Sequence, residues 1–487
     1  MNRKKTVFIY ANQGFAVRYI LQSDIFTKLK DHVRIVILSH NADEKSFVKQ
    51  FKSENVLIKK FFHERCAQWL KNKKIQKLFL EFRAFVLNGN YDTRTIDDFR
   101  KIYLAQRGWT KQDGLTGRIK GFVWESIASI FKKCRLLRKT LIWVESKFLY
   151  PRFHGAVFEK YKPSLVIVNA LCGFQYNELL AREAKSYHVP VCCVVLSWDN
   201  TTGMGMPGYE PDHVISWTQK MKQELIELND IDENKIAVGG VAHFDCYYDK
   251  QLILSKKILC EKLKLDENKK IIFYATKSPK RFPWGPELVK DVADAIDSGR
   301  IDPKSQLLVR IHPLHYRRID GKLIFQNILD QYSDLERKYN CIRLNIPSVV
   351  SEKMDFNLAQ SEQILVAGIL KNSDVMLNMF STMVIEAAIF DTPSINVCIQ
   401  ERCKADYKKS RQDIMIDYVQ THNRRVIETN GVKTVFTMDE LFNAIDAYLK
   451  APGLDSENRD IIVKNEAGPY QGNAGEMIAN QILSFIK

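Results

Sequence analysis

The cysteines of this sequence show no pairing pattern. Ten of them are scattered along the chain, with no CxxC pair and no regular spacing, and the adjacent Cys192 and Cys193 lie in an apolar run that predicts a buried strand. Disulfide-stabilised domains and cysteine-based zinc sites carry cysteines at characteristic spacings. The sequence therefore indicates neither class, and we expect reduced thiols in a cytoplasmic protein.

Long apolar runs are also missing. No uninterrupted apolar stretch reaches the roughly 20 residues that a membrane-spanning helix needs. Residues 1–15 have a charged start and only a short apolar run, which predicts a first strand instead of a signal peptide. We expect a cytoplasmic location, with peripheral attachment at the inner face of the cytoplasmic membrane as an additional hypothesis.

Acidic residues are outnumbered by basic ones. The 487 residues carry a formal net charge of +16, which indicates anionic partners such as nucleic acid, nucleotide phosphates or an acidic membrane surface. The sequence has no RNP-like aromatic motif, zinc finger or helix-turn-helix signature, so a non-enzymatic nucleic-acid-binding protein has the least support. A hydrophobic content of 45% is sufficient for two domains with substantial cores.

The stretch from Lys371 to Gln400 has the pattern of a strand, a loop, a helix and a second strand. Ser381 and Thr382 are predicted at the helix N-terminus, where free backbone N–H groups favour an anion such as phosphate. Glu386 follows one turn later, within reach of a ribose hydroxyl. The alternative interpretation is an N-cap hydroxyl and a helix carboxylate in an ordinary βαβ unit.

The α/β pattern occurs twice, which predicts an α/β protein with two Rossmann-like doubly wound domains. We place the first domain at 1–248 and the second at 249–455, followed by a C-terminal helical segment, 456–487, that is expected to pack back toward the first domain. A GxGxxG dinucleotide fingerprint is absent. The predicted strands are 6–10, 33–39, 56–59, 163–169, 190–196, 213–217 and 236–238 in the first domain, and 270–275, 307–311, 375–379 and 394–399 in the second.

A helical and basic insertion is predicted at about 64–158. Its part from 118 to 152 has aromatic and aliphatic residues interleaved with nine Lys or Arg and only two Glu. One interpretation is a surface that docks on anionic lipid headgroups. The other is a helix pair with its apolar face in the core and a solvated basic face.

Four motifs in the chain from about Val191 onward resemble a known family. They are SWDNTTGMGMPGYEPDHVISW from Ser197, VGGVAHFD from Val238, RIHP from Arg310 and NSDVMLNMFSTMVIEAAIFDTP from Asn372, and the closing YQGNAGEMIANQI also fits. Together they resemble GT-B-fold glycosyltransferases of bacterial surface-polysaccharide assembly, with the first half matched by architecture alone. UDP-N-acetylglucosamine 2-epimerases and CDP-glycerol-type polyol-phosphate transferases share the plan, and His312-Pro313 is a partial match to both.

The resemblance implies a donor nucleotide in the second domain and an acceptor in the first. Donor-side candidates are Lys277, Arg310, His312, Phe380, Ser381, Thr382 and Glu386. Acceptor-side candidates are Asn12, Gln13, Gly14 and Asn200. Candidates for the catalytic base are Asp199, then His243 and Asp245, and the alternative for Asp199 is a turn cap.

The resemblance further implies a reaction with no cofactor beyond a nucleotide-sugar co-substrate. No DxD motif is predicted at a strand end, so we expect no catalytic metal. The leading hypothesis is a glycosyltransferase that moves a sugar to a cell-surface glycan or a lipid-linked acceptor. A polyol-phosphate transferase or a nucleotide-sugar 2-epimerase is the alternative, and nucleic acid is not expected as a partner.

Overall fold

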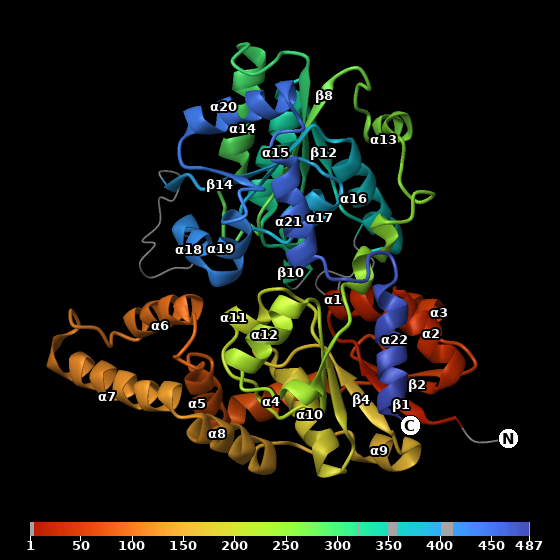
Figure 1. Ribbon diagram of the computed structural model, residues 1–487, viewed down its shortest axis with the longest axis vertical. Coiled ribbons are helices and arrows are strands. Elements are labelled where there is room, and N and C mark those ends of the chain that lie inside the picture. The colour runs from red at the N-terminus through yellow and green to blue at the C-terminus, as the bar shows by residue number, and fades with distance from the viewer. Residues whose placement is uncertain (1–3, 320, 349–357, 401–412, 487) are drawn as a thin grey trace. The chain divides into compact units, whose positions relative to one another are not determined.

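A computed structural model describes residues 4–319, 321–348, 358–400 and 413–486 (Figure 1). The chain forms two compact units. The N-terminal unit comprises Met1–His243 and Gly468–Lys487, and the C-terminal unit comprises Phe244–Ala467. The C-terminal segment predicted at 456–487 is therefore divided between the units, and the first boundary falls slightly before the predicted residue 248.

The N-terminal unit is built on a parallel sheet with the order β3-β2-β1-β4-β5-β6-β7. From β1 the chain winds outward through β2 and β3, and it then returns to β4 beside β1 to wind the other way. The topological switch point of this sheet lies between β1 and β4. The strands are β1 (Thr6–Tyr10), β2 (Arg34–Ser39), β3 (Val56–Lys60), β4 (Leu165–Val168), β5 (Val191–Val194), β6 (His213–Ser216) and β7 (Ile236–Val238).

Helices and single turns cover this sheet, and the last helix returns to the first part of the chain. In α22, Glu476 pairs with Lys28 of α2 at 3.0 Å. Gly475 lies so close to α2 that a Cβ there would approach the Cβ of Asp24 to 2.9 Å. The elements are α1 (Gly14–Ala16), a π-helical turn η1 (Val17–Leu21), α2 (Asp24–His32), α3 (Lys45–Phe51), α9 (Gly155–Tyr161), α10 (Gln175–Ser186), α11 (Asn200–Gly203), α12 (Gln219–Glu227), η2 (Glu233–Lys235) and α22 (Ala474–Phe485). The turn η3 (Ala242–Tyr247) includes the point where the chain passes from the N-terminal to the C-terminal unit.

The segment predicted as a helical insertion folds as a set of helices between β3 and α9. Figure 1 shows α6 and α7 at one side of the N-terminal unit, beyond α11 and α12, with α8 following α7. These helices are α4 (His63–Asn72), α5 (Lys74–Arg83), α6 (Arg94–Gln106), α7 (Gly114–Lys133) and α8 (Arg135–Phe148). In the described part of the chain, none of the helices combines the length and the apolar character needed to cross a membrane.

The C-terminal unit repeats the plan with the parallel order β12-β9-β8-β13-β14-β15. Here the switch point lies between β8 and β13. The strands are β8 (Lys270–Ala275), β9 (Ser305–Arg310), β12 (Ile342–Asn345), β13 (Val375–Asn378), β14 (Ser394–Val397) and β15 (Lys433–Val435), with a small hairpin of β10 (Arg318–Ile319) and β11 (Lys322–Leu323). β12 and β15, which form the two edges, were not predicted from the sequence.

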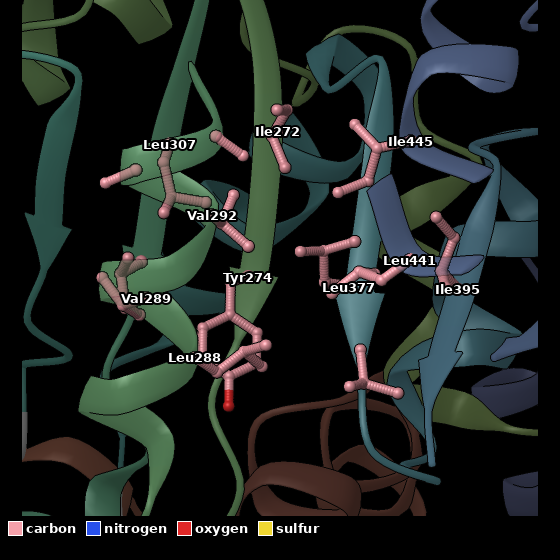
Figure 2. Packing of buried hydrophobic residues seen from close by; sticks show 14 of the residues in the cluster. Ile272, Tyr274, Leu288, Val289, Val292, Leu307, Leu377, Ile395, Leu441 and Ile445 are labelled. Atoms are coloured by element: carbon pink, nitrogen blue, oxygen red, sulfur yellow. The ribbon is translucent and has the colours of Figure 1, made fainter. Parts of the chain in front are cut away.

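Helices cover both faces of this second sheet because successive strand residues point to opposite sides. On β8, Ile272 and Tyr274 pack with α14 and α20, as Figure 2 shows, whereas Ile271 and Phe273 join the core formed with α13 and α16. The helices are α13 (Lys256–Leu263), α14 (Gly285–Asp297), η4 (Pro313–Tyr316), α15 (Gln326–Lys338), α16 (Gln360–Asn372), α17 (Met383–Ile389), α18 (Ile414–Val419), α19 (Thr421–Ile427), α20 (Met438–Lys450) and α21 (Ser456–Glu466). The predicted class, α/β with two doubly wound sheets, is confirmed.

Candidate functional site

The switch point of the C-terminal sheet brings Lys277 to the loop after β13. Lys277 follows β8, and its Nζ donates a hydrogen bond of 2.9 Å to the carbonyl oxygen of Met379, which follows β13. In open parallel sheets, ligands bind outside the carboxyl ends of the strands at such a point. The contact joins residues 102 positions apart in the sequence at this edge.

Lys277 belongs to a charged cluster with Arg281 and Asp417, which we call the Lys277 cluster. Asp417 forms an ion pair with Lys277 and lies 3.0 Å from the Arg281 guanidinium. Burial lowers the pKa of Lys277, and the Asp417 carboxylate opposes that shift. Because two cations face one carboxylate, the cluster keeps a net positive charge at the sheet edge.

Asp417 was not predicted as a site residue. It lies on α18. The side-chain amide of Asn423 on α19 donates to the Asp417 carbonyl oxygen at 2.8 Å, and that of Gln420 donates to its carboxylate at 3.1 Å. Its pairing with Lys277 could not be read from the sequence, because the two residues lie 140 positions apart.

The loop between β13 and α17 has a left-handed residue. Phe380 has φ +53°, an uncommon conformation for a residue other than glycine. Ser381 donates its backbone N–H to Asn378 at 3.2 Å, and its hydroxyl accepts from the Met383 N–H at 3.1 Å. Thr382 precedes α17 without a side-chain cap. Ser381 is therefore the capping hydroxyl, and Phe380 carries the backbone strain of the turn.

Glu386 lies in α17 and is nearly buried. Its carboxylate accepts a hydrogen bond from the phenolic hydroxyl of Tyr247, a residue of η3 that is also buried. A carboxylate accepts several hydrogen bonds. A bond from Tyr247 is therefore compatible with further hydroxyl donors to Glu386.

His312 is held as a neutral ring after β9. Burial, together with the nearby His315, Lys277 and Arg310, lowers its pKa to about 3. Its Nδ1 accepts the Leu314 N–H at 3.2 Å, so the neutral ring carries its proton on Nε2. His312 is thus a neutral polar group at this sheet edge, and not a cation.

Arg310, the last residue of β9, is buried among polar partners. Its guanidinium donates to Asn345 of β12 and pairs with Glu362 of α16 at 2.8 Å. The charge is therefore neutralised by a neighbouring carboxylate within the unit. Arg310 differs in this respect from the Lys277 cluster, where cations are in excess.

The N-terminal sheet has neutral polar groups at its own switch point. The Asn12 side-chain oxygen accepts from the His40 backbone N–H at 2.7 Å and also contacts the His40 ring. Asn169, after β4, donates its side-chain amide to the Tyr10 carbonyl at 2.8 Å. Gln13 and Gly14 follow Asn12 at the start of α1. The three acceptor-side candidates after β1 therefore lie together at this edge.

Asp199 and Asn200 lie in the loop after β5. The Asp199 carboxylate accepts a hydrogen bond from the Ser197 hydroxyl, and its carbonyl accepts from the Gly203 N–H at 2.9 Å as α11 begins. Asn200 is buried, and its side-chain oxygen has no hydrogen-bond partner among the residues that the structure describes. A buried unpaired acceptor of this kind is uncommon in proteins.

His243 and Asp245 are the two other candidates for the catalytic base. The His243 ring stacks on Tyr19 with centroids 3.5 Å apart, and burial together with the charge of Arg18 lowers its pKa well below the usual value. Asp245 belongs to the C-terminal unit, where burial and the Asp245 charge raise the pKa of Tyr248 to about 12.

Known structures share this fold. A Listeria monocytogenes protein assigned as a UDP-N-acetylglucosamine 2-epimerase matches with a TM-score of 0.54 at 12% identity, over 99% of this chain and 97% of that chain. The Neisseria meningitidis UDP-GlcNAc 2-epimerase bound to UDP-GlcNAc gives 0.53 at 12% identity, over 99% of this chain and 100% of that one. Staphylococcus aureus MnaA with UDP gives 0.52 at 13% identity, over 99% and 97%.

These likenesses establish the GT-B fold, and the predicted relation in plan to 2-epimerases is confirmed at the level of the fold. No protein-family model matches the chain. No curated protein matches it in sequence.

Proposed function

We propose that this protein is a GT-B glycosyltransferase that takes a sugar from a nucleotide-sugar donor bound to the C-terminal unit. The observation that carries the proposal is the Lys277 cluster. It places a net positive charge at the switch point between β8 and β13. A nucleoside diphosphate is the ligand class whose charge and place in such folds match that edge.

The cluster supplies the electrostatic part of the mechanism. As the bond between the sugar and the diphosphate breaks, negative charge develops on the leaving oxygen, and a positioned cation stabilises it. Lys277 and Arg281 take this role, because the Arg310 charge is already paired with Glu362. The neutral His312 donates a hydrogen bond from Nε2 to the same phosphates.

Glu386 and the loop Phe380–Thr382 complete the donor side. Glu386, oriented by Tyr247, accepts hydrogen bonds from the ribose hydroxyls. The left-handed turn at Phe380 presents the backbone before α17 to the phosphates. This assignment gives each donor-side candidate except Arg310 a direct role.

The N-terminal unit binds the acceptor in this proposal. Asn12, Gln13, Gly14 and Asn200 offer neutral hydrogen-bonding groups to a glycan or a lipid-linked sugar. Asp199 is the preferred base, since the His243 ring is buried against Tyr19. The reaction needs no metal ion or resident cofactor, and it takes place in the cytoplasm on a cell-surface glycan precursor.

A nucleotide-sugar 2-epimerase is the second candidate, and the observation that favours it is the fold shared with such enzymes along almost the whole chain. The two functions differ in their products. An epimerase interconverts two nucleotide sugars with no acceptor, whereas a transferase releases the nucleoside diphosphate only as the acceptor is glycosylated. The protein is incubated with UDP-GlcNAc, with and without acceptor, and NMR of the products distinguishes the two functions.

The first experiment is a thermal-shift screen of UDP, GDP, CDP, CMP and ADP. A ligand at about 100 times its dissociation constant stabilises a fold by about 2.7 kcal/mol, which is readily measured. We expect one nucleoside diphosphate to raise the melting temperature of the wild type more than that of Glu386→Gln. The melting temperature of Tyr247→Phe, which keeps the Glu386 carboxylate, should also rise more than that of Glu386→Gln. If no nucleotide changes the melting temperature of the wild type, the donor site does not exist as proposed.

A further inference from the structure

Helix α7 buries one side against its neighbours in the insertion. Gly117, Gly121 and Ala128 are buried on this side, and the Trp124 ring lies 5.7 Å from the Phe82 ring of α5. Only glycine fits at Gly121, because a Cβ there would approach the Trp109 carbonyl oxygen to 2.1 Å. The side that faces the protein is therefore fixed by close packing.

The opposite side of α7 is also apolar, but it is exposed. We call this side the α7 outer face. At 3.6 residues per turn its members lie about half a turn from the glycine side. Leu115 and Phe122 are each 75% exposed. The α7 outer face consists of Leu115, Ile119, Phe122, Val123 and Ile130.

A helix that is apolar on two opposite sides is normally buried on both. Surface helices of soluble domains carry polar residues on the side away from the core. The α7 outer face extends over about 22 Å of helix, from Leu115 to Ile130. Contiguous exposed apolar surface of this kind marks a site of association.

The charges beside the α7 outer face are positive. Arg118 and Lys120 flank it on either side, and Lys133 ends it; all three are exposed. The one carboxylate of α7, Glu125, lies 3.2 Å from Arg100 of α6 and is neutralised there. Lys132 points elsewhere, because it pairs with Asp97 at 2.7 Å.

Helix α8 also exposes both apolar and basic side chains. α8 follows α7 in Figure 1 and exposes Leu136, Trp143 and Phe148. Lys147 is exposed between the two aromatic residues. Exposed aromatic and basic residues in alternation are typical of helices that lie in the headgroup region of a bilayer.

We propose that the α7 outer face docks the protein on a bilayer that contains anionic lipids. The apolar side chains enter the boundary between headgroups and acyl chains, and Arg118, Lys120 and Lys133 bind the lipid phosphates. A second copy of the chain does not fit as well, since a symmetric contact would bring these cations against one another. The inference does not depend on the proposed transferase activity.

Vesicle sedimentation with the full-length chain tests the inference. The vesicles are phosphatidylcholine alone, or an equal mixture of phosphatidylcholine and phosphatidylglycerol. We expect the wild type to sediment with the anionic vesicles and to be released by salt, which screens the charges. Changing Arg118, Lys120 and Lys133 together to Gln should weaken binding on the order of a hundredfold.

The second part of the experiment changes apolar residues of the α7 outer face and includes a matched control. Leu115→Ser, Ile119→Ser and Phe122→Ser together should weaken binding at least about tenfold, since the lost burial of each side chain adds up. The control variant carries Ile319→Ser, Ile346→Ser and Leu454→Ser, which change three exposed apolar side chains of the C-terminal unit. It should bind as the wild type does.

Three results would overturn the inference. One is equal binding to neutral and anionic vesicles, and another is equal binding of the α7 variants and the control. The third is a wild-type protein that does not bind vesicles but is a dimer by light scattering, whereas the variant changed at Leu115, Ile119 and Phe122 is not a dimer. That result would assign the face to a second copy of the chain. Circular dichroism verifies that each variant is folded, so a loss of binding is not a loss of structure.

Discussion

The two units share one architecture but differ at the carboxyl edges of their sheets. In the N-terminal unit, the three residues that follow each of β1 to β7 include no lysine or arginine. Amide groups such as those of Asn12 and Asn169 fill the switch point there. In the C-terminal unit the same position holds Lys277, Arg281 and Asp417.

The N-terminal unit has its own charged cluster, but it lies inside the fold. Arg83, Glu145, Glu178 and Arg182 are all buried, and we call them the buried charge network. Arg182 lies 2.5 Å from Glu145 and 3.5 Å from Glu178, and Arg83 pairs with both carboxylates. The network joins α5 and α8 of the insertion to α10.

The same network also holds the loop after α11. Arg83 donates to the Met206 carbonyl at 2.9 Å, and Arg182 donates to the Gly208 carbonyl at 2.6 Å. The buried charge network of the N-terminal unit therefore links structural elements, whereas the Lys277 cluster of the C-terminal unit lies where a ligand binds in this fold. A doubly wound sheet provides a place for a ligand, and the residues at the strand ends decide which ligand it takes.

The largest effect is expected from Arg182→Met. The change leaves two buried carboxylates with one guanidinium, and breaking a buried pair in this way costs about 3–5 kcal/mol. Urea unfolding followed by circular dichroism measures it. Lys101→Met is the control, since Lys101 is exposed and its pair with Asp98 should contribute no more than about 1 kcal/mol. Equal stability of the two variants would contradict the structural role of the network.

Lys277→Met should weaken the binding of the nucleoside diphosphate. Loss of a charged hydrogen bond to phosphate costs about 1.5–3 kcal/mol, or roughly 10- to 100-fold in the dissociation constant of the nucleotide diphosphate. Titration calorimetry measures it. Lys280→Met, three residues further along the same loop and exposed, is the control and should bind within about twofold of the wild type. If Lys280→Met is the weaker binder, the phosphates lie elsewhere on the loop.

Acid should destabilise the C-terminal unit through its buried histidines. Burial lowers the pKa of His312 to about 3 and that of His315 to about 4. Below the usual histidine pKa of about 6.5, the unfolded chain binds protons that the folded unit does not, so stability falls as the pH decreases toward 4. Each histidine contributes up to about 1.4 kcal/mol per pH unit.

Urea unfolding between pH 7 and pH 5 measures this loss of stability. His315→Gln removes one of the two groups, so its unfolding free energy should depend less on pH than that of the wild type, whatever its stability at pH 7. Equal pH dependence in the two proteins would show that His315 takes up a proton in the folded state.

The smallest effect is expected at the carboxyl edge of the N-terminal sheet, where the candidate binding residues are neutral. Gln13→Ala, at the start of α1, should leave the dissociation constant of the nucleotide diphosphate within about twofold, since no charge is removed. It should instead raise the KM for the acceptor. A change in nucleotide affinity as large as that of Lys277→Met would remove the division of roles between the two units.

The strands that form the centre of each sheet could be predicted from the sequence. Buried parallel strands appear as short apolar runs, and β8 and β13 lie at or within one residue of their predicted bounds. The edge strands β12 and β15 were missed because their residues are partly polar, as expected where one side of a strand is less covered.

The candidate site was predicted in part. Strand-end residues such as Lys277, His312 and Ser381 followed from the order of strands and loops, because parallel strands end at one edge. Asp417 could not be found in this way, since it reaches Lys277 from a helix 140 residues later. The ion pair between Arg310 and Glu362 could not be predicted from the sequence either, because it depends on how α16 packs beside β9.

The sequence by itself determined the two α/β sheets, the excess of positive charge and the basic, apolar character of the insertion. Local periodicity and composition are sufficient for these. Only the tertiary structure decided which cations are available to a partner. Arg138 is buried against Asp230 at 2.6 Å, whereas Arg118 on the preceding helix is exposed. The pattern of a helix defines its faces, but the neighbours that pack against it determine which face is buried.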